Sequence, residues 1–197
     1  MAAVDKCDSG QFSEADVKRP ESWVLLSFVM DPRTGLGRYK DYRISNYQLM
    51  EKLAHKCRHE SIDYILKDDD IVERVKRYFA QEAEYEAMIQ RYSRVDGNVL
   101  VIDLHDCPEI VTGNRFKEYV LFPTQNISIR ILWGFQKQNM VITAGHSVFN
   151  RTSKTDVGSL MLAHGGGGHP YVGTCQVPVD QWEQVRDDLI IQMKADG

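Results

Sequence analysis

The sequence has few cysteines and no long hydrophobic run, and each shortage excludes a class of protein. Four cysteines in 197 residues, with no Cys-x-x-Cys pair, exclude a small disulfide scaffold and favour reduced thiols. The longest apolar run, Trp23 to Met30, is far shorter than the ~20 residues that a membrane-spanning helix needs. The N-terminal residues carry acids and no apolar signal core. We therefore expect a cytoplasmic protein that does not associate with membranes.

The sequence also lacks a strong excess of charge of one sign. It has 28 acidic residues against 24 lysines and arginines, which gives a net charge of −4. This balance excludes a protein that attracts nucleic acid by an overall positive field, so any anion site must be local. A hydrophobic fraction of 43% with 26% charged residues is ordinary for a globular protein and excludes wholesale disorder.

Residues 46 to about 93 are predicted to be helical, because apolar residues recur there three and four positions apart. One such set predicts a buried stripe on a first helix: Tyr47, Met50, Leu53, Ala54 and Cys57. A second stripe, from Ile71 to Ile89, predicts one continuous helix. The aspartates at 68–70 precede it, where carboxylates favour the positive end of a helix.

After Gly97 the hydrophobic period changes from 3.6 to 2, which predicts strands. The runs that fit lie at residues 99–104, 119–122, 127–133, 140–144 and 171–177. A short helix is predicted at 156–163, with Asp156 as its cap, and an amphipathic helix from Trp182 closes the chain. The predicted fold class is α/β (α+β), with a helical N-terminal and linker region followed by a mixed β-sheet domain with flanking helices.

The strongest local feature is the run Gly165, Gly166, Gly167, Gly168 and His169. Consecutive glycines cost conformational entropy, but they let backbone N–H groups approach and converge on an anion. His169 beside them can donate a hydrogen bond to a phosphate oxygen. No Gly-Lys-Ser/Thr follows, so this is not a Walker loop. Composition alone leaves a phosphate-binding loop and a flexible loop equally open.

The wider sequence around these glycines resembles a known family. His164–Pro170, preceded by Thr155–Gly158 and followed by Val172–Thr174, resembles the glycine-histidine (GGGH) signature of the DHH-associated C-terminal domain. The chain is also similar to the exopolyphosphatase-related branch of the DHH phosphoesterases over Tyr119–Phe122, Ile127–Gly134 and Gly145–Thr152. The resemblance implies a two-lobed, manganese-dependent hydrolase that cleaves a phosphate ester or phosphoanhydride.

The resemblance divides the chain into three parts. Residues 1–45 would be a remnant of the N-terminal DHH lobe, 46–96 a helical linker and 97–197 the DHH-associated C-terminal substrate-binding domain. The sequence has no Asp-His-His triplet and no Asp-x-Asp at the end of a predicted strand. Asp8, in Asp-Ser-Gly-Gln-Phe12, matches the family's last metal motif and is implied as a manganese ligand. One carboxylate cannot assemble a two-metal site, so we expect the chain alone to be inactive and not to hold manganese.

The same resemblance implies where substrate binds. Gly165 to Gly168 and His169 would seat its phosphate. Relatives often place an arginine on the strand before the glycines, where this sequence has His146, so Arg151 or Arg130 could supply the charge. The predicted function is therefore the C-terminal substrate-binding portion of a DHH-type phosphoesterase.

A non-catalytic module that binds phosphate or nucleic acid for a partner is the alternative function. The expected partners are a phosphate-containing substrate (a nucleotide, an oligonucleotide or polyphosphate) and a separate DHH catalytic lobe. A homodimer is left open.

Two further clusters of side chains are weaker candidates for a catalytic or metal-binding site. Asp103, His105 and Asp106 follow a predicted strand and could act in acid–base catalysis, although ordinary loop residues are the favoured interpretation. His55 and His59 stand one helical turn apart, a spacing that can chelate zinc, but no third ligand accompanies them. An exposed polar helix face is therefore the favoured interpretation of that pair.

Overall fold

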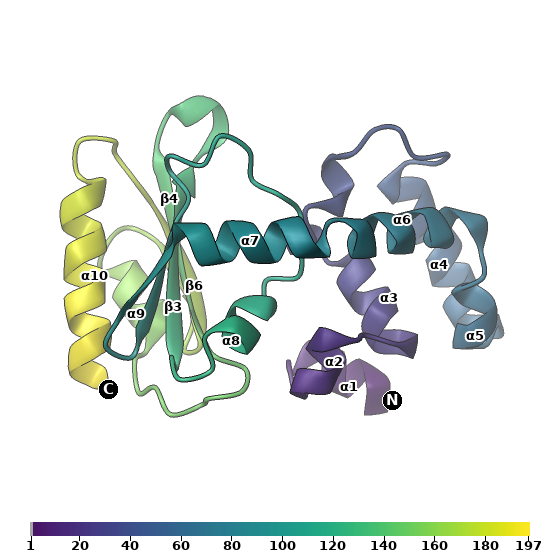
Figure 1. Cartoon of the computed structure of the whole chain (residues 1–197), viewed down its shortest axis with the longest axis horizontal. Helices are drawn as coiled ribbons and strands as arrows, with labels where there is room; N and C mark the ends of the chain where they lie inside the picture. The colour runs from purple at the N-terminus through teal and green to yellow at the C-terminus, as the bar shows by residue number, and fades with distance from the viewer. Residues whose placement is uncertain (1) are drawn as a thin grey trace. The chain divides into compact units, whose positions relative to one another are not determined.

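A computed structural model of the chain describes residues 2–197 (Figure 1). These residues form two compact units. The first runs up to Ala87 and includes Val111–Lys117, and the second comprises Met88–Ile110 and Glu118–Gly197. The division of the chain into residues 1–45, 46–96 and 97–197 concerns the origin of each part and stays a prediction.

The first unit is built from helices. They are α1 (Ala2–Asp8), α2 (Glu14–Lys18), α3 (Ser22–Met30), α4 (Asn46–His59), α5 (Ile62–Ile65), α6 (Asp69–Ala80) and the start of α7 (Glu82–Tyr92). Ser13 and Ser45 begin α2 and α4 with capping boxes, because each side chain accepts from a backbone N–H three residues on. Asp68 caps α6, as the aspartate run predicted. A core cluster joins α3 to α6 through Leu26, Leu49, Leu53, Ile65 and Ile71.

The prediction of a single helix from Ile71 to Ile89 is wrong, because α6 ends at Ala80 and α7 begins at Glu82. The Gln81 N–H donates to the Arg77 carbonyl oxygen at 3.2 Å, which is the last backbone hydrogen bond of α6. The Gln81 side chain bonds to Tyr39 and Thr112 in two loops. These contacts with two loops fix Gln81 between α6 and α7. The helical periodicity of the sequence does not reveal them.

The second unit is a six-stranded mixed sheet with helices against it. Its strands are β1 (Ser93–Asp96), β2 (Val99–Asp103), β3 (Ile127–Trp133), β4 (Met140–His146), β5 (Gly167–His169) and β6 (Val172–Val177), in the order β1-β2-β3-β4-β6-β5. The β2–β3 pair is parallel and the other pairs are antiparallel. Figure 1 shows α9 (Val157–Leu162) and α10 (Trp182–Asp196) on one side of the sheet and α8 (Lys117–Leu121) on the other. The predicted α/β class with a mixed sheet is confirmed.

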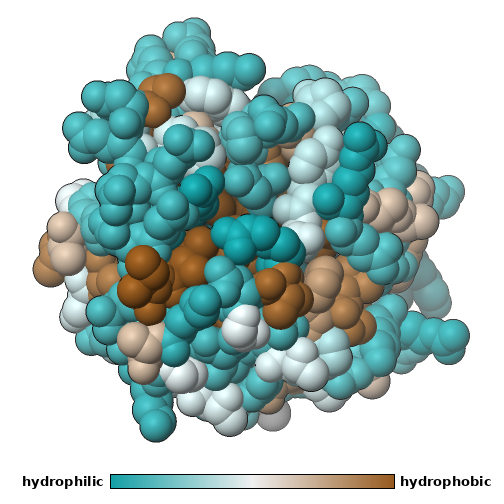
Figure 2. All heavy atoms as spheres, turned by 60° about the vertical axis from the view of Figure 1, so that its left-hand side comes forward, coloured by the Kyte–Doolittle hydropathy of each residue, from teal (hydrophilic) through white to brown (hydrophobic). Residues whose placement is uncertain are grey.

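The main core lies between the sheet and the helices α9 and α10. Ile127, Ile129 and Ile131 alternate along β3 and face this core, in agreement with the period of two that predicts a strand at residues 127–133. Trp182, Leu189 and Met193 of α10 cover it, and Asp156 caps α9. Figure 2 shows that the surface on the α10 side is mostly hydrophilic, as expected for the outer face of an amphipathic helix.

Two predictions for this unit need correction. Tyr119–Phe122, predicted as a strand, lies largely within helix α8. The Tyr119 hydroxyl reaches the Ser128 hydroxyl and the Gly145 carbonyl oxygen, so contacts across the sheet set the conformation of this short apolar run. Residues 167–169, predicted as loop, form the edge strand β5. None of the helices described in residues 2–197 has the length and hydrophobicity required to cross a membrane.

Candidate functional site

The face of the sheet opposite α9 and α10 is accessible near its β5 edge. Along β6, Val172, Thr174 and Gln176 are exposed on this face, whereas Cys175 and Val177 are buried on the other. Gly167 pairs with Thr174 and His169 pairs with Val172. Because directly opposed residues share a face of a sheet, Gly167 and His169 both lie on the accessible face. We call this region, Gly165 to His169 with Thr174, the glycine edge.

Three of the four consecutive glycines are required by the fold. Gly165 has φ of +74° and ends α9, where only glycine is unstrained. A Cβ atom on Gly166 would lie 2.1 Å from the Thr174 carbonyl oxygen, and one on Gly168 would lie 2.2 Å from the Val172 carbonyl oxygen. These two glycines therefore allow β5 to pack closely on β6.

Gly167 is the exception among the four. A Cβ atom at this position would meet no atom within 4 Å. The space above the Gly167 backbone is therefore open, and packing within the fold gives no reason for a glycine there. β5 is also the edge strand, and an edge strand presents backbone N–H and C=O groups that no neighbouring strand pairs. A ligand can approach this backbone directly.

His169 is exposed beside Gly167 on the accessible face. Within residues 2–197 its imidazole makes no hydrogen bond or ion pair. Thr174, the cross-strand neighbour of Gly167, donates its hydroxyl to the Ile142 carbonyl oxygen at 3.1 Å. The glycine edge thus offers an exposed imidazole and an accessible strand backbone, which are both groups that can bind a phosphate oxygen.

The structure does not place His146 with the glycine edge. His146 pairs with Ile127, which faces the α9 and α10 core, so by alternation its side chain lies on the opposite face from His169. Its Nε2 atom lies 2.8 Å from the Thr155 carbonyl oxygen, and its ring packs edge-on to Tyr171. These contacts give His146 a structural role, because they attach it to the loop that precedes α9.

Arg130 lies on the accessible face but is already paired. Its cross-strand neighbour is Thr143, which pairs with Thr174, so Arg130 and Gly167 are three strands apart, or about 14 Å at ~4.8 Å per strand. The Arg130 guanidinium forms an ion pair with Glu118 at 2.5 Å. Glu118 also accepts from the Ser128 hydroxyl at 2.7 Å. The Arg130 charge is therefore compensated within the fold.

Arg151 lies in the loop between β4 and α9. Its side chain is exposed, and its Nε atom donates to the Val148 carbonyl oxygen at 3.1 Å. Of the residues predicted to bind phosphate, the structure thus brings together the four glycines and His169. It places Arg130 away from them along the sheet and His146 on the other face.

Asp8 is the last residue of α1 and is exposed. Residues 2–197 contain no group of three or more histidine, cysteine, aspartate or glutamate side chains that could hold a metal ion. A two-metal centre needs several oxygen and nitrogen donors around ions ~3.5–4 Å apart. The residues present around Asp8 therefore do not fit such a centre.

Two other candidates are explained by pairing within the fold. His105 lies between Asp103 and Asp106, with its ring nitrogens 2.6 Å and 3.0 Å from their carboxylate oxygens, and its ring packs on Trp182. Both ring nitrogens are therefore engaged. His55 and His59 lie side by side on α4 with ring centroids 4.8 Å apart and, within residues 2–197, no third ligand.

Sequence reasoning missed two features of the site. Thr174 lies beside Gly167, and Glu118 compensates Arg130 from a different element. The pairing of Thr174 with Gly167 depends on the register between β5 and β6, which no local pattern in the sequence specifies. No local signal links Glu118 to Arg130, because the helix that carries Glu118 was predicted as a strand.

Comparison with known proteins finds solved structures that are similar to this chain. The chain is similar to the pGpG-specific phosphodiesterase PggH from Vibrio cholerae, with 48% sequence identity and a TM-score of 0.89. The match covers 100% of this chain and 66% of that protein, so the chain spans slightly less than two thirds of the phosphodiesterase. No family model matches the chain, and no curated protein matches it in sequence.

Two more distant structures are also similar. A DHH domain from a protein described as a member of a family of ribosomal proteins is 15% identical, with a TM-score of 0.51 over 97% of this chain and 45% of that one. An exopolyphosphatase-related protein from Bacteroides fragilis is 14% identical, with a TM-score of 0.42 over 76% of this chain and 43% of that one. The first of these two likenesses shows a shared fold.

Proposed function

Because the chain belongs to the DHH family of phosphoesterases, we propose that it is the substrate-binding portion of such an enzyme and that the glycine edge seats the substrate's phosphate. PggH is named for hydrolysis of pGpG, and it is 48% identical to this chain. The proposed substrate class is therefore a short phosphorylated oligonucleotide, with a guanine dinucleotide as the first candidate. We also propose a cytoplasmic location, because all four cysteines are free thiols.

The observation that carries this proposal is the open space at Gly167. The other three glycines are explained by a positive φ or by close strand packing, and Gly167 is not. A glycine that the fold does not need is explained if a ligand must approach the backbone at that position. A phosphate is suitable because backbone N–H groups and an imidazolium both donate to its oxygens.

His169 adds directional recognition to the backbone contacts. It shares the accessible face with Gly167 two residues earlier in the same strand. When protonated it can donate one charge-assisted hydrogen bond, worth roughly 1.5–3 kcal/mol. His169→Ala is therefore expected to weaken phosphate binding by about ten- to a hundredfold.

Isothermal titration calorimetry with pGpG and with short-chain polyphosphate tests the proposal. In Gly167→Val the new side chain blocks the backbone, so we expect binding to be lost. The variant should still fold, because valine is favoured in strands and the space at position 167 is free. Gln176→Val is the matched control, since Gln176 is exposed on the same face of β6. Wild-type affinity in folded Gly167→Val and His169→Ala would refute the proposed site.

Hydrolysis requires groups that residues 2–197 do not bring together. We propose that a separate DHH catalytic lobe completes the enzyme and that manganese is its metal. We expect the chain alone to bind substrate without hydrolysing it, and the same absence of a metal cluster favours a non-catalytic binding module as the second candidate. Manganese-dependent turnover of bis-p-nitrophenyl phosphate by the purified chain would contradict both.

A further inference from the structure

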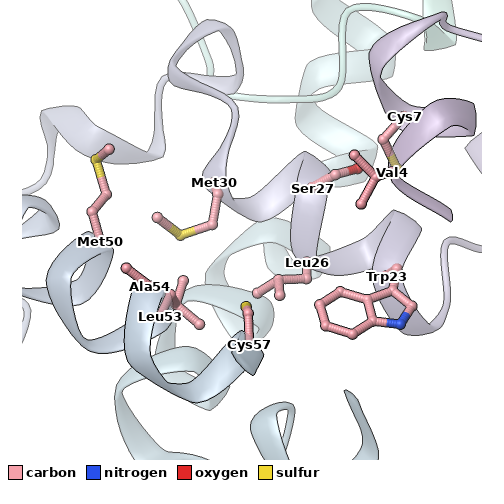
Figure 3. Close-up of a pocket in the computed structure, with 10 residues that line it drawn as sticks. All are labelled: Val4, Cys7, Trp23, Leu26, Ser27, Met30, Met50, Leu53, Ala54 and Cys57. Atoms are coloured by element: carbon pink, nitrogen blue, oxygen red, sulfur yellow. The ribbon is translucent and has the colours of Figure 1, made fainter. Parts of the chain in front are cut away.

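An apolar groove of about 350 Å³ opens on the surface of the first unit. Figure 3 shows it between α1, α3 and α4, with Trp23 and Met30 on one wall and Met50 and Cys57 on the other. None of the residues that line it carries a charge. Val4 and Met50 line the groove and are 65% and 62% exposed. An uncharged surface with exposed side chains of this size is typical of a site that another molecule covers.

The exposed face of α4 adds to this groove. Tyr47, Met50, Ala54 and Cys57 were predicted to be buried together with Leu53, but only Leu53 of this set is buried. This prediction is wrong for the chain by itself, because the elements described in residues 2–197 leave these four side chains exposed, although α1 and α3 line the groove opposite three of them. The other side of α4 is occupied, since Lys52 forms ion pairs with Asp68 and Asp70 at 2.6 and 2.7 Å. Helix α4 is therefore amphipathic with an uncovered apolar face.

The comparison with PggH indicates what covers this face. All of this chain has a counterpart in that protein at 48% identity, and about a third of that protein has no counterpart here. That third belongs to the same polypeptide as the matched part in the phosphodiesterase, which makes it the candidate to cover an exposed apolar surface of that part. The groove and the adjoining face of α4 provide an uncharged surface for it.

We propose that the apolar groove between α1, α3 and α4 is the docking site for a polypeptide equivalent to the unmatched third of PggH. The occupant would insert apolar side chains between Trp23, Met30 and Met50. Two methionines suit this role because their unbranched side chains adapt to a partner's shape. The inference rests on the proposed function in one respect, since it takes the chain to be part of a larger phosphoesterase.

Two cysteines in the groove allow a direct test. Cys7 and Cys57 line it, Cys107 lies outside it and is partly exposed, and Cys175 is buried in the other unit. The experiment compares the full chain with a chimera in which the unmatched third of PggH is joined to it. Each protein is labelled with a maleimide, and the labelling rate of each cysteine is measured by mass spectrometry. We expect Cys57 labelling to slow by about tenfold or more in the chimera, and Cys107 labelling to stay the same.

A charge placed in the groove provides an independent measurement. Met50→Glu should leave the melting temperature of the chain alone unchanged, because the side chain is 62% exposed there. In the chimera it should lower the melting temperature and restore Cys57 labelling. Ile191→Glu is the matched control, since Ile191 is an apolar side chain 66% exposed on α10, outside the groove. It should change neither protein.

Three results would overturn the proposal. The first is unchanged Cys57 labelling in a folded chimera. The second is protection of Cys57 in the chain alone that rises with protein concentration, because a second copy would then occupy the groove. If the chimera does not fold, the unmatched third is co-expressed as a separate chain, and failure to co-purify is the third.

Failure of this proposal can be separated from failure of the proposed function. If the chain binds pGpG but Cys57 is not protected in the chimera, the docking site is wrong and the phosphate site stands. Protection of Cys57 without pGpG binding would support the docking site and refute the phosphate site.

Discussion

Replacing each of the four glycines at 165–168 by alanine, one at a time, tests how the glycine edge is built. Gly167→Ala should leave the free energy of unfolding unchanged or raise it by up to ~1 kcal/mol. The added methyl meets no atom within 4 Å, and alanine restricts the unfolded chain more than glycine does. Gly165→Ala should lower the free energy of unfolding by about 1 kcal/mol, because an alanine is strained at φ of +74°.

Gly166→Ala and Gly168→Ala should be the most harmful of the four. Their methyl groups would lie 2.1 and 2.2 Å from carbonyl oxygens of β6, so β5 must move away from β6. Overpacking of this kind costs about 1–3 kcal/mol. Because β5 is a short edge strand, the cost cannot exceed that of detaching it from the sheet. Loss of β5 would also remove phosphate binding.

Urea denaturation followed by circular dichroism measures these four differences, and calorimetry with pGpG measures binding by the same variants. The expected order of stability is Gly167→Ala, then Gly165→Ala, then Gly166→Ala and Gly168→Ala. If Gly167→Ala is as destabilising as Gly168→Ala, the space at position 167 is not free and the argument for a ligand-facing glycine fails. If Gly167→Ala is stable and binds pGpG with wild-type affinity, a methyl group is tolerated and only the larger valine can test the approach of ligand.

Three further predictions concern how side chains buried within the fold contribute to its stability. Arg74 is 1% exposed and donates to the carbonyl oxygens of Ile44 and Asp70, both at 2.8 Å. Arg74→Met would leave both oxygens without a donor, so it should lower the free energy of unfolding measured in urea by about 2–6 kcal/mol. Burial raises the pKa of the Cys175 thiol from 9.0 to about 11. The unfolded chain therefore loses this proton first, and the free energy of unfolding should fall by about 2 kcal/mol as pH rises from 9 to 11. Cys175→Ala should not show this fall in urea denaturation at the same pH values. Arg130→Met should lower stability by about 3 kcal/mol, because it leaves the Glu118 carboxylate, 7% exposed, without its cation; unchanged stability in urea would show that the pair contributes nothing.

Much of the local structure could be predicted from the sequence. Asp68 and Asp156 begin helices because their side chains cap backbone N–H groups a few residues on, an interaction that needs no distant partner. The alternation in β3 and the stripe on α10 identified core-facing residues correctly, since each pattern depends only on the period of its own element. The glycine-histidine run identified the family for the same reason, because all of its residues are adjacent in sequence.

Only the tertiary structure decided what covers each face and which charges are paired. Helical spacing placed Met50 and Cys57 on the same side of α4 as Leu53, yet it could not reveal that within residues 2–197 Leu53 is buried while Met50 and Cys57 stay exposed beside the groove. Arg130 was a candidate phosphate ligand until Glu118, twelve residues away on another element, compensated its charge. Four identical glycines acquired separate roles only in the folded chain, through the positive φ of Gly165, the close approach of β6 to Gly166 and Gly168, and the open space at Gly167. A periodic sequence specifies which residues share a face, but burial, pairing and open space depend on chain segments that meet only after folding.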